Sequence, residues 1–176
     1  MKISLLTLVF VSLFTQTQLH ASKGETLGDL FLLTLPTFSY GSTFYFHDKT
    51  GRTMFYKSFA SNLTATLLLK YSINKKRPNG DNYAFPSGHS SITFQSASFL
   101  HFRYGIKYAF LPYLGAFYTA YSRVEAKQHD TTDVIAGALL GCLSSYIFTK
   151  SYKGWHLQTS IEVHKKNYTL LLTHPL

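Results

Sequence analysis

The chain has 176 residues, a length that suits one domain with a substantial core. Seventeen Lys and Arg residues against eight Asp and Glu give a formal net charge of +9, so we expect anionic partners such as phosphate esters or acidic lipid headgroups. Nucleic acid is not expected, because no basic stretch alternates with aromatic residues and no zinc-finger spacing is present. The one cysteine, Cys142, excludes an internal disulfide and a cysteine-based metal site.

The two ends of the chain differ from its middle. Lys2 precedes an apolar run over residues 3–14, and a possible cleavage site follows at Ala21. Residues 1–21 therefore read as a signal peptide, or as a first membrane helix if they are not removed. We expect residues 22–153 to form a helical domain and residues 154–176 to form a tail, which alternates like a strand in places and gives no functional signal.

Five apolar segments make up the middle of the chain. They are Leu27–Phe46, Met54–Leu69, Ser90–Phe102, Tyr108–Ser122 and Val134–Thr149. Their lengths and their lack of strict alternation favour helices over strands. Polar turn sequences separate them at His47–Arg52, Arg77–Gly88 and Arg103–Lys107. The sequence predicts an all-α fold, a compact bundle of about five to six helices with its active site at the helix ends.

Two settings are open for this bundle, the inner membrane and the periplasm. A membrane span takes about 20 apolar residues, and most of the segments are at or below the usual lower limit. Ala136, Gly137 and Gly141 place small residues on one helical face, which suits close helix packing in either setting. If the helices span a membrane, the positive-inside tendency puts the loops with Arg77 and Arg123 on the outer side.

The first polar cluster closes the Met54–Leu69 segment. Lys70 and Arg77 are seven residues apart, about two helical turns, so both cations point the same way if the helix persists. Pro78 is then expected to end it. Taken alone, this cluster also fits a basic helix end that faces acidic lipid or balances the helix dipole.

The second cluster is Phe85–Ser91, which opens the next segment. Ser87 is a candidate N-cap, and Gly88 lets the backbone approach a ligand closely. Free N–H groups at a helix start favour an anion such as phosphate. His89 stands in the first turn beside them. An ordinary capped helix with an exposed histidine is the alternative.

The third cluster is Ser122–Asp133. His129 and Asp133 are four residues apart, so on a helix the carboxylate can orient the imidazole ring. Arg123 offers a planar guanidinium that matches phosphate oxygens. Alternatively, Asp130 and Asp133 cap the following helix and His129 is a surface residue.

Together the three clusters indicate phosphoryl transfer without a metal. They offer a nucleophile, an acid for the leaving oxygen, and fixed positive charge for the equatorial oxygens of phosphorus. The motifs that carry this pattern are Lys70-x6-Arg77-Pro78, Pro86-Ser87-Gly88-His89 and Ser122-Arg123-x5-His129-x3-Asp133. In order and spacing they resemble the three-part signature of the phosphatidic acid phosphatase type 2 superfamily, which includes membrane lipid phosphatases, bacterial acid phosphatases and vanadium haloperoxidases.

The resemblance implies a role for each matching residue and no cofactor. His129 would be the nucleophile that forms a phosphohistidine, with Asp133 holding its ring, and His89 would be the general acid. The phosphate oxygens would be held by Lys70, Arg77, Ser87, Gly88 and Arg123. Residues 22–153 would then be a helical phosphatase domain.

Other functions fit the same residues less well. A metal site from His89, His129, Asp130 and Asp133 would place a metal cation beside lysine and arginine. Vanadium haloperoxidases are much larger as a class. Loss of His89 or His129 would have favoured a non-catalytic, membrane-associated protein that only binds phosphate, but both histidines are present.

The motifs leave the substrate open. The candidates are phosphatidate, phosphatidylglycerol phosphate, undecaprenyl pyrophosphate, a lipid A phosphate and a soluble ester. The apolar, aromatic-rich helices favour a lipid, and the N-terminal segment favours the periplasmic side of the inner membrane; a soluble periplasmic acid phosphatase is the alternative. Lys75 and Lys76 either meet a second phosphate or form a solvated basic turn.

Overall fold

The computed structural model describes residues 23–152, 158–164 and 167–173 of the chain, with side chains described over 26–152. The predicted signal peptide or first membrane helix, residues 1–21, lies outside the described residues. Five helices are described, and they confirm the all-α bundle. They are α2 (Lys23–Tyr45), α3 (Lys49–Ile73), α4 (Gly88–Tyr104), α5 (Ile106–Glu125) and α6 (Thr131–Phe148).

The tail contains strands, as its alternating sequence indicates. Strand β1 (Gln158–His164) pairs antiparallel with β2 (Asn167–Thr173), and Gln158 lies opposite Thr173.

Two of the expected turns are shorter in the structure. The segment predicted as a turn at His47–Arg52 is already helical from Lys49, because the Asp48 side chain caps α3 by accepting a hydrogen bond from the Gly51 N–H at 2.8 Å. At the predicted turn Arg103–Lys107, Gly105 alone separates α4 from α5. Its φ of +93° is a conformation that glycine adopts without a steric cost.

The expectation that the Lys70 helix continues toward Pro78 is wrong. Helix α3 ends at Ile73, and Asn74 takes the left-handed conformation with φ 44° and ψ 45°. Its backbone N–H donates to the Lys70 carbonyl at 3.0 Å, which closes the last turn. Arg77 therefore lies in the loop over residues 74–87, not on the helix that carries Lys70.

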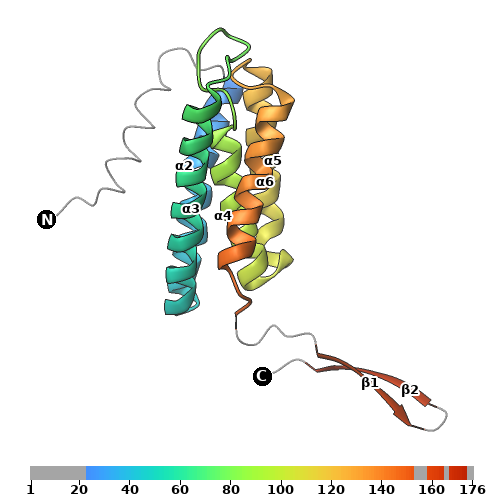
Figure 1. Cartoon of the computed structure of the whole chain (residues 1–176). Helices are drawn as coiled ribbons and strands as arrows, with labels where there is room; N and C mark the ends of the chain where they lie inside the picture. The colour runs from blue at the N-terminus through green and yellow to red at the C-terminus, as the bar shows by residue number, and fades with distance from the viewer. Residues whose placement is uncertain (1–22, 153–157, 165–166, 174–176) are drawn as a thin grey trace, which may run out of the picture.

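The helices run alternately up and down, so each end of the bundle collects a distinct set of residues (Figure 1). The starts of α2, α4 and α6 lie at one end, together with the C-terminal ends of α3 and α5. This motif-bearing end carries Lys70, Arg77, His89, Arg123 and His129. The loops with Arg77 and Arg123 lie at this end, and the turn between α4 and α5 lies at the other.

Helix α4 is the centre of the bundle and contacts each of the other four helices. Its interfaces combine hydrophobic core residues such as Phe99 with small and polar side chains. Gln95 donates to Ser58 Oγ at 2.8 Å, and Ser91 donates to Asn62 Oδ1 at 2.7 Å. The Ser145 hydroxyl of α6 donates to the Gln95 carbonyl at 2.7 Å. Such short side chains let helix backbones approach closely.

The outer surface is apolar in contrast to this polar interior. Exposed large hydrophobic residues lie on the outer helices, among them Leu30, Leu68, Phe117 and Leu139. Among the described residues, one helix, Thr131–Phe148, is long and apolar enough by length and composition to cross a membrane.

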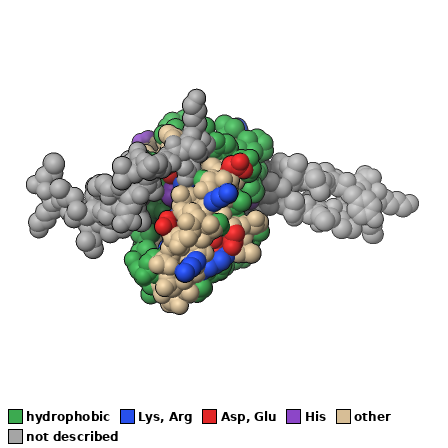
Figure 2. Space-filling model, turned by 90° about the horizontal axis from the view of Figure 1, so that it is seen from above, with side chains coloured by type: hydrophobic (Ala, Val, Ile, Leu, Met, Phe, Trp, Pro, Cys, Tyr) green, Lys and Arg blue, Asp and Glu red, His purple; other side chains and the backbone are tan. Residues whose placement is uncertain are grey.

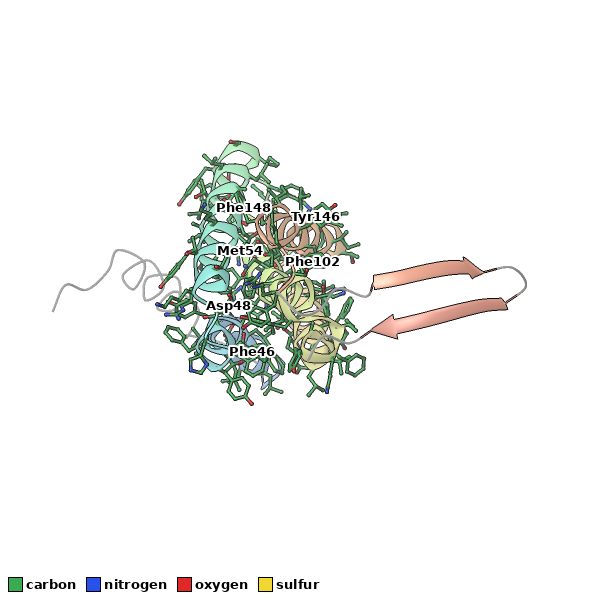
Figure 3. All side chains as sticks on the ribbon, turned by 90° about the horizontal axis from the view of Figure 1, so that it is seen from below. Phe46, Asp48, Met54, Phe102, Tyr146 and Phe148 are labelled. Atoms are coloured by element: carbon green, nitrogen blue, oxygen red, sulfur yellow. The ribbon has the colours of Figure 1, made fainter. Side chains whose placement is uncertain are left out.

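A buried ion pair between Arg103 and Asp48 holds the end opposite the motifs, and Figure 3 labels Asp48 there. The Arg103 guanidinium donates through both Nε and Nη2 to the Asp48 carboxylate, each at 2.6 Å, and Tyr104 donates to the same carboxylate at 2.9 Å. Burial acts to raise the pKa of Asp48, but its hydrogen bonds, that from Arg103 foremost, outweigh burial and lower that pKa. Arg103 also donates to the carbonyls of Lys150 and Ser151, which ties the chain after α6 to the bundle.

Glycines set the distance between α6 and α4, as the small-residue face predicts. A Cβ on Gly137 would lie 2.4 Å from the Ser87 carbonyl oxygen. A Cβ on Gly141 would lie 2.2 Å from the Ser91 carbonyl oxygen and 2.7 Å from the Gln95 nitrogen. These are backbone atoms, so a larger residue must move one helix away from the other.

We expect Gly141→Ala to lower the melting temperature of the detergent-solubilised protein, since overpacking costs roughly 1–3 kcal/mol. Gly41→Ala is the matched control, because a Cβ at Gly41 meets nothing within 4 Å and alanine favours a helix interior by about 1 kcal/mol. Thermal unfolding followed by circular dichroism compares the two variants. Equal melting temperatures would contradict the assigned helix spacing.

Candidate active site

All eight predicted site residues lie at the motif-bearing end. Seen from above in Figure 2, charged side chains of both signs lie on a polar surface with hydrophobic residues around it. Each motif stands where a helix begins or ends. Of the first motif, Lys70 lies in the last turn of α3 and Arg77 in the following loop, and the second motif, Ser87, Gly88 and His89, lies at the start of α4. Of the third motif, Arg123 lies in the last turn of α5, and His129 and Asp133 lie around the start of α6.

The start of α6 forms a capping box. Asp133 N–H donates to Asp130 Oδ1 at 3.0 Å, and Asp130 N–H donates to Asp133 Oδ2 at 3.1 Å. The two carboxylates therefore do cap the helix, as one interpretation of the sequence predicts. The other half of that interpretation is wrong, since His129 is only 3% exposed.

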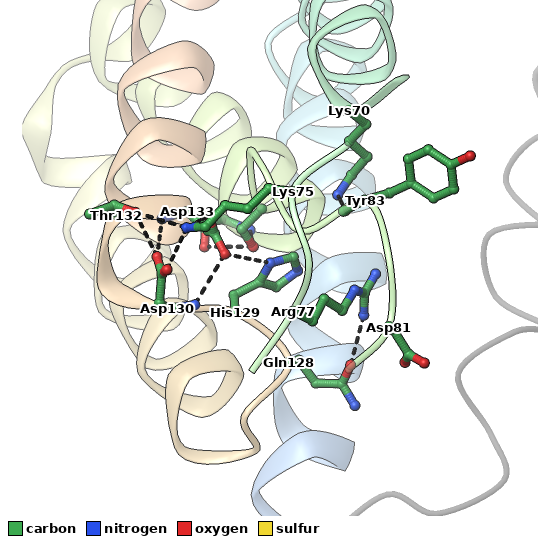
Figure 4. Close-up of polar contacts among 12 residues, drawn as sticks. Lys70, Lys75, Arg77, Asp81, Tyr83, Gln128, His129, Asp130, Thr132 and Asp133 are labelled. Atoms are coloured by element: carbon green, nitrogen blue, oxygen red, sulfur yellow. Dashed lines mark hydrogen bonds and ion pairs between the residues drawn. The ribbon is translucent and has the colours of Figure 1, made fainter. Parts of the chain in front are cut away.

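His129 is held against Asp133 in this buried position (Figure 4). Its Nδ1 lies 3.5 Å from Asp133 Oδ2, close but longer than a hydrogen bond. Burial lowers the pKa of the ring to about 2, and Lys70, Arg77 and His89 act in the same direction. A hydrogen bond to the backbone of Ala84 opposes them. The ring is consequently neutral at physiological pH, with a lone pair on one nitrogen.

The loop over residues 74–87 folds back over the site and places two cations. Arg77 Nη1 donates to Gln128 Oε1 at 2.7 Å, which brings Arg77 beside His129 in spite of the early end of α3. Lys70 Nζ donates to the Tyr83 carbonyl at 2.8 Å. The Lys70 side chain passes close to Gly88, where an added Cβ would lie 3.7 Å from its Cε. Lys70 of the first motif therefore lies beside the second motif, and Arg77 lies beside the third.

The second motif is joined to the third through its backbone. Ser87 is the N-cap of α4, as predicted, and its hydroxyl accepts from the Ser90 N–H at 3.4 Å. The Ser87 N–H donates to the Asp133 carbonyl at 2.9 Å. Gly88 and His89 then present the first N–H groups of the helix, which have no partner within it.

Lys75 has a role that its sequence position did not reveal. It forms a hydrogen bond and ion pair with Asp130, donates to Asp133 Oδ1 at 2.8 Å, and so binds the 74–87 loop to the start of α6. Burial acts to lower the pKa of Lys75, but the hydrogen bonds to these carboxylates outweigh it and raise that pKa. The hydrogen bond from Lys75 holds the pKa of Asp130 below its ordinary range. The solvated basic turn therefore fits Lys76, which is exposed, but not Lys75. A contact to a second phosphate stays a prediction.

Asp29 of α2 is a second residue that the motifs did not indicate. Its Oδ1 lies 2.9 Å from His89 Nε2 and 3.2 Å from Arg123 Nη1, and the residue is 5% exposed. A carboxylate inside the apolar segment Leu27–Phe46 was the available signal, because such a residue is usually paired or functional.

Within the described residues, no three His, Cys, Asp or Glu side chains converge in a way that could hold a metal ion. Of the four residues considered for a metal site, His89 faces Asp29 and Asp130 faces Lys75. Near His129, the cations Lys70 and Arg77 accompany the Asp133 carboxylate, and cations suit an anion better than a metal ion.

The sequence profile of the PAP2 superfamily matches residues 6–156. The chain belongs to this superfamily. The match covers all three motifs and all five described helices, so the resemblance inferred from the motifs is confirmed.

Individual members of the PAP2 superfamily are similar over shorter stretches. The chain is 41% identical over 80 residues to a lipid A 4'-phosphatase of Helicobacter pylori, covering 44% of this chain and 40% of that one. It is 36% identical over 78 residues to a lipid A 1-phosphatase of Porphyromonas gingivalis, a match that covers 42% of this chain and 18% of that one. The matches thus span less than half of each relative. The crystal structure of Aquifex aeolicus LpxE is similar in fold, with a TM-score of 0.54 and 23% identity over 68% of this chain and 83% of that one.

We expect the His129 ring not to titrate between about pH 5 and 8, although an unperturbed histidine does. Histidine-labelled protein in micelles, with His129→Gln to assign the signal, tests this by NMR. The unfolded chain binds a proton at His129 near an ordinary pKa of about 6.5, whereas the folded protein does not. The free energy of unfolding should therefore fall as the pH drops below about 6.5. A His129 midpoint close to the ordinary value would contradict the burial argument.

Proposed function

We propose that the protein is a metal-independent lipid phosphatase, which hydrolyses a phosphate monoester or pyrophosphate through a phosphohistidine at His129. One observation carries the proposal. His129 is a buried, neutral imidazole beside Asp133, and the charges that lower its pKa are those of Lys70 and Arg77, the groups that a phosphate would meet.

The reaction divides into two displacements at phosphorus. Because Nδ1 of His129 faces Asp133, the attack is assigned to Nε2. The P–N bond forms as the bond to the leaving oxygen breaks, and His89 donates a proton to that oxygen. A water molecule then attacks the phosphohistidine, His89 takes up a proton from it, and inorganic phosphate leaves with His129 restored.

Fixed positive charge stabilises the equatorial oxygens during both displacements. Lys70, Arg77 and Arg123 supply this charge from three separate segments of the chain. The N–H groups of Gly88 and His89 at the start of α4 add a partial positive charge that needs no rearrangement during the reaction.

The surface of the bundle supports a lipid as substrate. The helices expose large apolar side chains, including Phe38 on α2 and Ile147 on α6, while many of their small polar side chains are buried. A protein with this distribution meets hydrocarbon more favourably than water. The site lies at one end of the helices, where the headgroup of a bilayer lipid would stand. The names of the two similar phosphatases favour a lipid A phosphate as substrate. The N-terminal apolar segment favours the periplasmic side of the inner membrane as the place of the reaction.

Phosphate release by detergent-purified protein tests the substrate. The panel holds lipid A, undecaprenyl pyrophosphate, phosphatidate and a soluble aryl phosphate. We expect the highest kcat/KM on a lipid, with lipid A first. Equal or faster turnover of the soluble ester would overturn the lipid assignment and favour an acid phosphatase.

The same assay tests the chemistry. We expect His129→Ala to reduce turnover to background, and activity to survive a chelator. His47→Ala, an exposed histidine at the opposite end, is the control that should keep full activity. Substantial activity in His129→Ala would remove the nucleophile assignment, and restoration by a divalent ion after chelation would remove the metal-independent mechanism.

A further inference from the structure

Asp29 joins a residue of the second motif to a residue of the third. Its Oδ1 lies within 2.9 Å of His89 Nε2 and within 3.2 Å of Arg123 Nη1. Helix α2, which carries Asp29, contributes none of the residues that the three motifs contain. The carboxylate is therefore an addition to the motif residues that the fold supplies from a separate helix.

Helix α2 is held closely at this point. A Cβ added to the neighbouring Gly28 would lie 2.4 Å from Ser122 Oγ and 3.2 Å from Arg123 Nη2. The α2 backbone thus lies against side chains in the last turn of α5, and these would have to shift to admit a side chain at position 28. This contact fixes the position from which the Asp29 carboxylate reaches His89.

The geometry points to Asp29 as the positioning residue for the general acid, an inference that rests on the proposed phosphatase function. With Nε2 of His89 bonded to the carboxylate, Nδ1 is the nitrogen left to face the substrate. The Nδ1 proton passes to the leaving oxygen as the P–O bond breaks, and the imidazole is left neutral. The carboxylate favours the protonated ring that begins this step and holds its plane.

Arg123 limits how the carboxylate can move. The same Oδ1 lies close to both partners, so the Arg123 guanidinium anchors Asp29 beside His89. Lys70 is the other cation that acts on His89, and burial of the ring also disfavours its charge. The Asp29 carboxylate acts against both burial and the nearby cations, because it favours the protonated form of the His89 ring.

The test compares two leaving groups. An alkyl phosphate needs a proton on its leaving oxygen, whereas a nitrophenyl phosphate releases a stable anion without one. We expect Asp29→Asn to lower kcat at least tenfold more on the alkyl phosphate than on the nitrophenyl phosphate, with a smaller change in KM. Thr34→Ala, an exposed change on the same helix, should leave both rates unchanged.

Two further variants separate positioning from a structural role. Asp29→Glu keeps the charge and should recover part of the alkyl phosphatase activity. His89→Asn should show the same dependence on leaving group, and the double variant Asp29→Asn/His89→Asn should lose little more than His89→Asn alone, because both changes act on one step.

The contrary results are distinct. An equal loss on both phosphates, or additive losses in the double variant, would show that Asp29 only supports the fold or Arg123, and would overturn the inference. Failure of Asp29→Glu to exceed Asp29→Asn would do the same. If the unaltered protein, while folded, releases phosphate from neither of these esters nor from any lipid of the panel, the proposed function itself fails, and the inference fails with it.

Discussion

Positive charge gathered at one end of an apolar helical bundle is the constraint on which this structure depends. Lys70, Arg77 and Arg123 would repel one another in a low-dielectric setting unless anions offset them. Asp133 and Asp29 supply part of that compensation from α6 and α2, each within reach of an imidazole or a cation. Asp81 of the 74–87 loop also offsets part of the Arg77 charge. In the proposed function, a phosphate would be a further anion among the three cations, which are already in place before it binds.

The close packing of α4 and α6 converts this charge distribution into a defined geometry. Gly137 and Gly141 let the two backbones meet, and the Ser87 N–H then donates directly to the Asp133 carbonyl. The start of α4 and the start of α6 are therefore one unit, which sets the distance between the histidines at their ends. Packing by small polar residues serves a bundle whose outer face is apolar, because shape and hydrogen bonds there replace the hydrophobic effect as the source of specificity.

Much of the site could be predicted from the sequence because its residues have fixed local spacing. The His129–Asp133 pair and the Ser87 cap depend on only a few neighbouring residues, and the helical pattern gave the elements around them. Asp29 and Lys75 could not be assigned in this way. Their partners lie 60 and more than 50 residues away, so their roles depend on which helix ends meet in the folded chain. The early end of α3 was missed for a local reason, the left-handed conformation of Asn74.

A direct search for the covalent intermediate tests the central claim, that His129 is the nucleophile in a phosphate pocket. The protein is mixed with a lipid phosphate labelled at phosphorus, quenched with alkali within the first turnover, and digested for peptide mapping. We expect an alkali-stable, acid-labile phosphoryl group on the peptide that contains His129, and none in His129→Ala. Turnover without any labelled protein, or a label on another residue, would contradict the assignment of His129 and with it the mechanism derived from this site.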